Sequence, residues 1–150
     1  MLNSFDNKVM ALTNYKATIR AAGDGFLVAT SPSGHSQVLD VKGDRNTAPT
    51  PMELLLISVA ACTAVDVEDI LKKKRQDVSE YIVEIEGMRR EEFPRGFVAF
   101  NVHHIVHGRS VSEKALADAI KLSDEKYCSV AYTVRPTAEI TTSYEIIEVE

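Results

Sequence analysis

The 150-residue sequence has no tryptophan, only two cysteines (Cys62 and Cys128) and no excess of positive charge. Two cysteines are too few for a disulfide-rich secreted scaffold, and without a Cys-x-x-Cys pair they do not form a zinc ribbon. Seventeen basic residues against 22 acidic ones leave a net charge of -5, which disfavours nucleic acid as a partner. The composition leaves the two thiols open as one bridge, a redox pair or two inert core residues.

Long apolar segments are also missing. The most apolar stretch, residues 54–65, has about twelve residues and is too short to span a bilayer. Residues 1–10 lack the basic start and apolar core of a signal peptide. We therefore expect a cytoplasmic protein with no membrane partner, in a compartment that keeps thiols reduced.

Cofactor motifs are scarce. No glycine-rich phosphate loop is present, and Gly23-Asp24-Gly25 is typical of a turn. His103, His104 and His107 are close in sequence, but on a strand His104 points away from the other two. His103 and His107 would then lie about 13 Å apart, too far to share one ion. The sequence predicts no metal and no nucleotide cofactor.

Glycine and proline are concentrated between residues 23 and 51. Their spacing indicates turns inside a single domain that covers residues 1–150, not a linker between two domains. Alternating patterns and turn residues predict a hairpin and a third strand in this part of the chain, over residues 15–19, 26–30 and 36–41.

Thr50-Pro51-Met52-Glu53 is the clearest local signal in the sequence. It has the pattern of a capping box, with proline at the first helical position. It predicts a helix that runs to about Lys74, and the apolar residues nearly all round its middle predict that this helix is buried.

The second half of the chain predicts two strands, a helix and a last strand. The strands cover residues 81–88 and 96–106, with Gly108 ending the second, and the last strand covers 138–149. Ser112 is expected to cap the helix, whose apolar stripe comprises Ala115, Leu116, Ala119, Ile120 and Leu122. The order βββ-α-ββ-α-β, with strands in runs suited to antiparallel pairing, predicts an α+β fold.

Cys62 falls in the middle of the long helix, beyond the field of the helix N-terminus. Asp66, one turn later, would disfavour a thiolate if it faced the same way. These features favour an inert apolar residue unless the fold brings a cation to Cys62. Cys128 follows the second helix, where access is easier.

Two cysteine-containing segments are similar to the OsmC/Ohr family. They read APTPMELLL (48–56) followed by AACTAVDV (60–67), and KYCSV (126–130). The segments RQDV (75–78) and IVHGR (105–109) resemble the YhfA-like branch. The resemblance covers nearly the whole chain from about Tyr15.

The resemblance implies a fold and an activity. The expected fold is OsmC-like: a curved antiparallel sheet wrapped on two main helices, in an intertwined homodimer with active sites at the interface. The expected activity is reduction of organic hydroperoxides by a thiol peroxidase. Cys62 would attack the peroxide and become a sulfenic acid, and Cys128 would resolve it as a disulfide that an external dithiol reduces.

The resemblance also implies an activating ion pair, and here the sequence departs from the family. The usual glutamate position falls on Met52, so Glu53 is one place late. The usual arginine position is Gly23, which leaves Arg20 and Arg45 as candidates. The alternative function is therefore a non-catalytic or weakly catalytic dimer that binds a small molecule or senses redox state.

Overall fold

The structure is a computed structural model that describes residues 14–150. Residues 1–10, on which the prediction about a signal peptide rests, lie outside the described part. Internal contacts divide the chain into two compact units, Met1–Pro51 and Met52–Glu150. The single domain predicted for residues 1–150 stays a prediction.

The first unit contains a three-stranded antiparallel sheet. Its strands are β1 (Thr18–Gly23), β2 (Phe26–Thr30) and β3 (Ser36–Asp40), paired in the order β1-β2-β3. The predicted hairpin is confirmed, although β1 begins at residue 18 instead of 15. Asp24 and Gly25 form the turn at φ 48° and 78°, a region that glycine and aspartate tolerate best.

The long helix α1 covers Pro51–Lys73, as the capping pattern predicted. Its buried residues recur every fourth position, which places them in one stripe: Val59, Thr63, Val67 and Leu71. The prediction that α1 is buried all round is wrong for a single chain. Ile57 and Val65 are 55% and 54% exposed, because within this chain only one stripe of the helix is covered.

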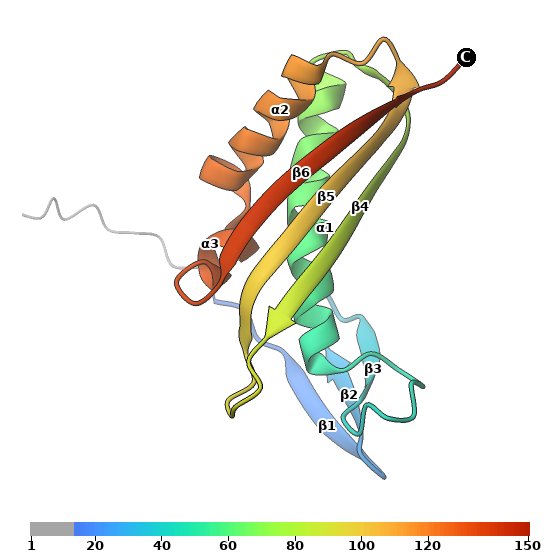
Figure 1. Cartoon of the computed structure of the whole chain (residues 1–150). Coiled ribbons are helices and arrows are strands. Elements are labelled where there is room, and N and C mark those ends of the chain that lie inside the picture. Colours follow the sequence, from blue (N-terminus) through green and yellow to red (C-terminus); the bar gives the residue numbers. More distant parts are fainter. Residues whose placement is uncertain (1–13) are drawn as a thin grey trace, which may run out of the picture. The chain divides into compact units, whose positions relative to one another are not determined.

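The second unit contains a sheet with strand order β4-β5-β6 (Figure 1). The strands are β4 (Asp77–Arg89), β5 (Phe97–Arg109) and β6 (Glu139–Glu148). β4 and β5 pair antiparallel, whereas β5 and β6 pair parallel. The expectation of an antiparallel sheet is therefore wrong for this pair. The helices between β5 and β6 return the chain to the same end of the sheet, which is the connection that parallel strands require.

β5 does not end at Gly108 as predicted. Gly108 remains in register with Val78 of β4. A Cβ atom at Gly108 would lie 2.2 Å from the carbonyl oxygen of Asp77, so the glycine permits a close approach of two strands. Here glycine continues the strand where the sequence pattern predicted a break.

Helix α2 covers Glu113–Leu122, and the predicted Ser112 cap is confirmed, since its side chain accepts a hydrogen bond from the backbone N–H of Ala115. The buried stripe ends at Ile120, because Leu122 is 38% exposed. A π-helical turn, η1 (Ser123–Tyr127), and a short helix, α3 (Ser129–Val134), follow. Neither element is predicted by the local sequence pattern.

Two buried clusters hold α1, α2 and α3 on the sheet of the second unit. Val67 and Leu71 of α1 meet Val106 of β5 in the first cluster, together with Leu116, Ala119 and Ile120 of α2. The second cluster comprises Val59, Phe100, Val134 and Ala138. Val59 and Val67 lie on either side of Cys62 on α1, so the two clusters hold this part of the helix against the sheet.

No helix of the described residues is long and apolar enough to cross a membrane.

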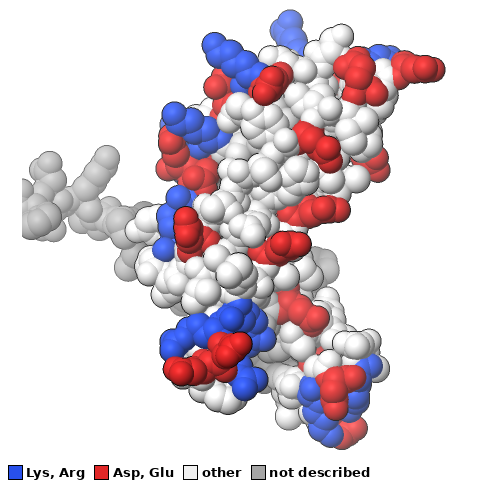
Figure 2. Space-filling model, in the orientation of Figure 1, with Lys and Arg blue, Asp and Glu red and all other residues white. Residues whose placement is uncertain are grey.

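The other face of this sheet carries charged and histidine side chains. His103 and His107 lie on it beside Glu145 and Glu80, with nitrogen–oxygen distances of 3.5 and 3.8 Å. Figure 2 shows acidic side chains scattered over one face of the molecule, with uncharged surface between them. His104 is fully buried, which confirms the prediction that it points away from its two neighbours.

Buried His104 predicts an acid-sensitive fold. Desolvation lowers its pKa from 6.5 to about 4, so the folded chain binds this proton less readily than the unfolded chain. The stabilisation is present above pH 6.5 and is lost as the pH falls toward 4. We expect His104 to remove roughly 3 kcal/mol from the free energy of unfolding over that range. Urea unfolding at several pH values measures it. The decline should be smaller in His104→Gln, and an equal decline would contradict this account.

Candidate functional site

The fold brings Cys62, Asp66 and Cys128 together. The two sulfur atoms and a carboxylate oxygen of Asp66 all lie within 4.8 Å of one another. Both cysteines are free thiols. Cys62 and Asp66 come from α1, whereas Cys128 comes from the junction between η1 and α3. The predicted pair of cysteines thus shares one site, and Asp66 faces the same way as Cys62.

Local backbone structure explains how each side chain reaches the site. Cys62 and Asp66 are one turn apart on α1, so they project from the same side of the helix. Cys128 is the N-cap of α3, and its sulfur accepts a hydrogen bond from the backbone N–H of Ala131 at 3.4 Å. The backbone N–H of Cys128 donates a hydrogen bond to the backbone carbonyl oxygen of Ser123 at 2.9 Å, and this bond closes the turn of η1.

Ser123 is a site residue that the sequence analysis missed. It is fully buried, and its hydroxyl lies 3.0 Å from Oδ2 of Asp66 and 3.1 Å from Oγ1 of Thr63. It therefore holds the carboxylate beside the two thiols. Its only signal in the sequence is its position immediately after the apolar stripe of α2, which does not distinguish it from an ordinary helix-ending serine.

Cys128 is the less accessible thiol, contrary to prediction. It is 5% exposed, whereas Cys62 is half-buried. The reason is that a capping side chain turns back toward its own helix. Burial raises the pKa of the Cys128 thiol to about 12, and a hydrogen bond with Cys62 and the negative charge of Asp66 act in the same direction. Cys128 is accordingly a neutral thiol at physiological pH.

A surface groove of about 440 Å³ leads to Cys128. Its walls come from η1 and α3 and comprise the side chains of residues 124–129, Tyr132, Thr133 and Arg135. Of Cys62, Asp66 and Cys128, only Cys128 lines this groove.

Arg45, one of the predicted activating residues, already has acidic partners in the first unit. Its guanidinium binds Asp40 at 2.7 Å and Asp24 at 2.8 Å, and it stacks 4.1 Å above the ring of Phe26. The hydrogen bond from Arg45 holds the pKa of the Asp40 carboxyl well below its usual range. These contacts give Arg45 a structural role in the loop after β3.

Arg20 and Glu53 are the other two predicted activating residues. Arg20 is exposed on β1 and forms no ion pair with any residue from 14 to 150. Glu53 lies in the first turn of α1. At about 1.5 Å and 100° per residue, Glu53 is roughly 13.5 Å along the axis from Cys62 and on the opposite side of the helix. Within one chain, Glu53 does not contact Cys62.

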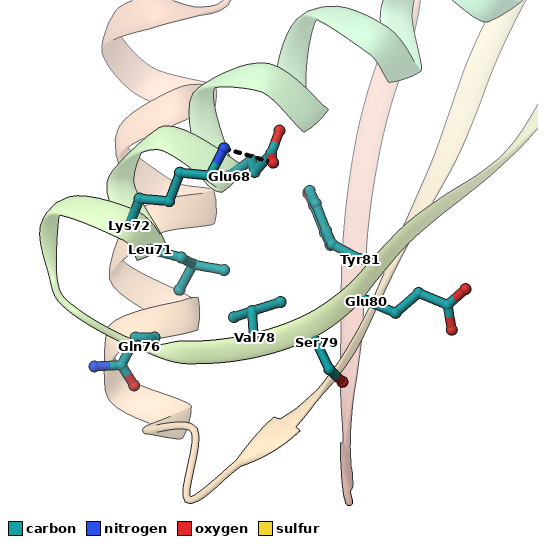
Figure 3. Close-up of a pocket in the computed structure, with 8 residues that line it drawn as sticks. All are labelled: Glu68, Leu71, Lys72, Gln76, Val78, Ser79, Glu80 and Tyr81. Atoms are coloured by element: carbon teal, nitrogen blue, oxygen red, sulfur yellow. Dashed lines mark ion pairs between the residues drawn. The ribbon is translucent and has the colours of Figure 1, made fainter.

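A second pocket, of about 140 Å³, lies between the end of α1 and the start of β4. Figure 3 shows Val78 and Tyr81 pointing from β4 toward α1, with the Glu68–Lys72 ion pair near Tyr81. The hydroxyl of Tyr81 lies 2.7 Å from Nδ1 of buried His104. The pocket is smaller than the roughly 300–1,000 Å³ typical of ligand sites, and no thiol lines it.

Comparison with known proteins decides the family. The family described as OsmC-like protein matches residues 43–143. The chain belongs to this family. It is 47% identical to Protein YhfA of Escherichia coli K12 over 118 residues, which are 78% of this chain and 87% of that protein. This agrees with the resemblance to the YhfA-like branch.

Solved structures support the same fold for this OsmC-like protein. A hypothetical protein from Aquifex aeolicus is 32% identical, with a TM-score of 0.82 over 93% of this chain and 100% of that one. The organic hydroperoxide resistance protein OhrB of Bacillus subtilis is 19% identical, with a TM-score of 0.59 over 90% of this chain and 100% of that one. The latter likeness concerns the fold alone.

Proposed function

We propose that this OsmC-like protein is a thiol peroxidase that reduces organic hydroperoxides. The observation that carries the proposal is the convergence of two free thiols from distant segments, with sulfur atoms within 4.8 Å. A disulfide needs about 2.05 Å between the sulfurs, so the two side chains must approach further when the bond forms. The Bacillus subtilis protein that shares the fold is named for resistance to organic hydroperoxides, which supports the proposal.

Cys62 is the attacking thiol in this proposal because it is the more accessible one. Its thiolate attacks the terminal peroxide oxygen, the O–O bond breaks, and the alcohol leaves with a proton. Cys62 is now a sulfenic acid. Cys128 attacks its sulfur, a disulfide forms, and the hydroxyl leaves as water with the proton of Cys128. An external dithiol then returns both thiols, so no metal or nucleotide enters the cycle.

We also propose that the active form is an intertwined homodimer in which the whole chain forms one OsmC-like domain. Ile57, Ala61 and Val65 are exposed along one side of α1. A helix whose apolar residues face solvent gains free energy by packing against a second copy. The two free thiols are consistent with a cytoplasmic location.

The alternative is a weakly catalytic dimer that binds a small molecule or senses redox state. Two observations favour it: Asp66 places negative charge beside both thiols, and Arg45 is paired with Asp24 and Asp40. A thiol titration separates the two functions. A Cys62 pKa clearly below the free value of about 8.5 supports the peroxidase, and a value at or above it supports the alternative.

Replacing Cys62 by serine tests the peroxidase directly. We expect Cys62→Ser to abolish consumption of an alkyl hydroperoxide, because an alcohol does not supply the thiolate nucleophile at neutral pH. Stopped-flow mixing of reduced protein with the peroxide measures the rate. Asp69→Asn, on the exposed side of the same helix, should react like wild type. A wild-type rate no faster than that of Cys62→Ser would refute the proposed function.

A further inference from the structure

We propose that reduced Cys62, Asp66 and Cys128 form a binding site for a thiophilic divalent cation of the zinc class, with the fourth coordination position open to solvent. The ion is an inhibitor of the thiols and not a cofactor of peroxide reduction. The binding site stands on the geometry alone. Its competition with peroxide rests on the proposed function.

The three donors match the preferences of such an ion. Two thiolates and one carboxylate oxygen suit zinc and disfavour magnesium or calcium, which take oxygen ligands. The donors lie within 4.8 Å of one another. A tetrahedral zinc site with bonds of about 2.0–2.3 Å needs donors about 3.5–3.8 Å apart. The donors are therefore at most about 1.3 Å farther apart than a tetrahedral zinc site requires.

Two of the three donor side chains, those of Asp66 and Cys128, already accept a hydrogen bond that orients them. The hydroxyl of Ser123 lies 3.0 Å from Oδ2 of Asp66, which directs the carboxylate while leaving its other oxygen for the ion. The backbone N–H of Ala131 points at the sulfur of Cys128 from 3.4 Å. Such second contacts fix the orientation of metal ligands and raise affinity.

The charge of the site also favours a cation. Asp66 forms no ion pair with any residue in the described part of the chain, and it accepts a hydrogen bond from the neutral hydroxyl of Ser123. Two thiolates and a carboxylate would bring three negative charges into one small space, where they repel one another. A divalent ion would replace this repulsion with attraction.

Oxidation would release the ion. Two thiolates, one hydroperoxide molecule and two protons give one disulfide, one alcohol and one water. Two electrons pass from the sulfurs to the broken O–O bond, and two of the three metal donors are lost. The ion therefore binds only the reduced protein, and by linkage it slows the reaction with peroxide.

Cobalt(II) is a suitable probe, because thiolate–cobalt charge-transfer absorption reports sulfur ligation directly. Reduced full-length protein is titrated without oxygen, and the disulfide form is titrated in parallel. We expect one ion per subunit, displacement by zinc, and no sulfur-linked absorption in the disulfide form or in Cys62→Ser. Asp66→Asn should weaken binding by at least about tenfold.

Two control variants separate this site from surface binding. Asp69→Asn removes a carboxylate from the same helix outside the cluster, and His103→Gln removes the histidine beside Glu145. Both should bind like wild type. Uptake that is unchanged in Asp66→Asn, persists in Cys62→Ser or is lost in His103→Gln would overturn the inference.

Peroxide consumption is measured on metal-free reduced protein from the same preparations, because a bound ion would itself slow the reaction. Protein that binds cobalt as expected but leaves peroxide intact would support the inference and refute the peroxidase alone. Protein that consumes peroxide but shows no thiolate–cobalt absorption would refute the inference alone.

Discussion

Without a reductant, Cys128→Ser should consume one hydroperoxide per subunit and then stop. Cys62 remains able to attack the peroxide, but its sulfenic acid has no neighbouring thiol to form a disulfide. We expect steady-state turnover with a dithiol reductant to fall by at least about a hundredfold, because resolution inside one site is replaced by attack from solution. A stopped-flow trace shows the burst, and a sulfenic-acid trapping reagent marks Cys62 by mass.

The control for this prediction is Ser143→Ala on β6, an exposed serine outside the groove that leads to Cys128. It keeps both thiols and should turn over like wild type. Undiminished turnover in Cys128→Ser would show that Cys128 is not the resolving thiol. Trapping on a residue other than Cys62 would show that the roles of the cysteines are wrongly assigned.

The double substitution Ile57→Asp and Val65→Asp should convert the proposed homodimer into monomers. Each apolar side chain is about half exposed in the single chain, and burying such a side chain contributes about 1.5–3 kcal/mol. In a two-fold homodimer both subunits contribute each of these residues to the interface, so the substitutions remove four apolar side chains. The four aspartates that replace them repel one another. We therefore expect the dimer dissociation constant to rise by at least about a thousandfold, equivalent to about 4 kcal/mol.

Sedimentation of wild type and variant over a range of concentrations measures this change. Ile82→Asp is the control, since Ile82 is exposed on β4 and lies outside the helix face in question. It should leave the oligomeric state unchanged. A wild-type chain that is monomeric at every concentration, or a double variant that stays dimeric, would contradict the proposed interface.

The strongest local patterns in the sequence predicted the fold well. Pro51 begins α1, and Ser112 caps α2, because capping and proline geometry are decided by neighbouring residues. The parallel pairing of β5 and β6 was missed. Strand direction depends on how the whole connection between strands runs, and neither strand records it in its own pattern.

At the candidate site, too, the residues in recognisable local segments were predicted, whereas the features that depend on distant parts of the chain were missed. The two cysteine segments were found by their resemblance to a family, and the fold brings their sulfurs within 4.8 Å. Ser123 was missed, and the exposure of Cys128 was predicted wrongly. Both depend on η1 and α3, short elements whose local sequence carries no strong signal. Distances across the fold, such as that between Asp66 and Ser123, have no counterpart in a linear pattern.

Direct observation of the Cys62–Cys128 disulfide tests the central claim. Reduced full-length protein is mixed with increasing amounts of an alkyl hydroperoxide, and the loss of peroxide is compared with peptide mapping of the cysteines. The account predicts one Cys62–Cys128 disulfide for each hydroperoxide consumed, with alcohol as the product. Peroxide that persists beside reduced protein, or peroxide loss while both cysteines remain thiols, would contradict it.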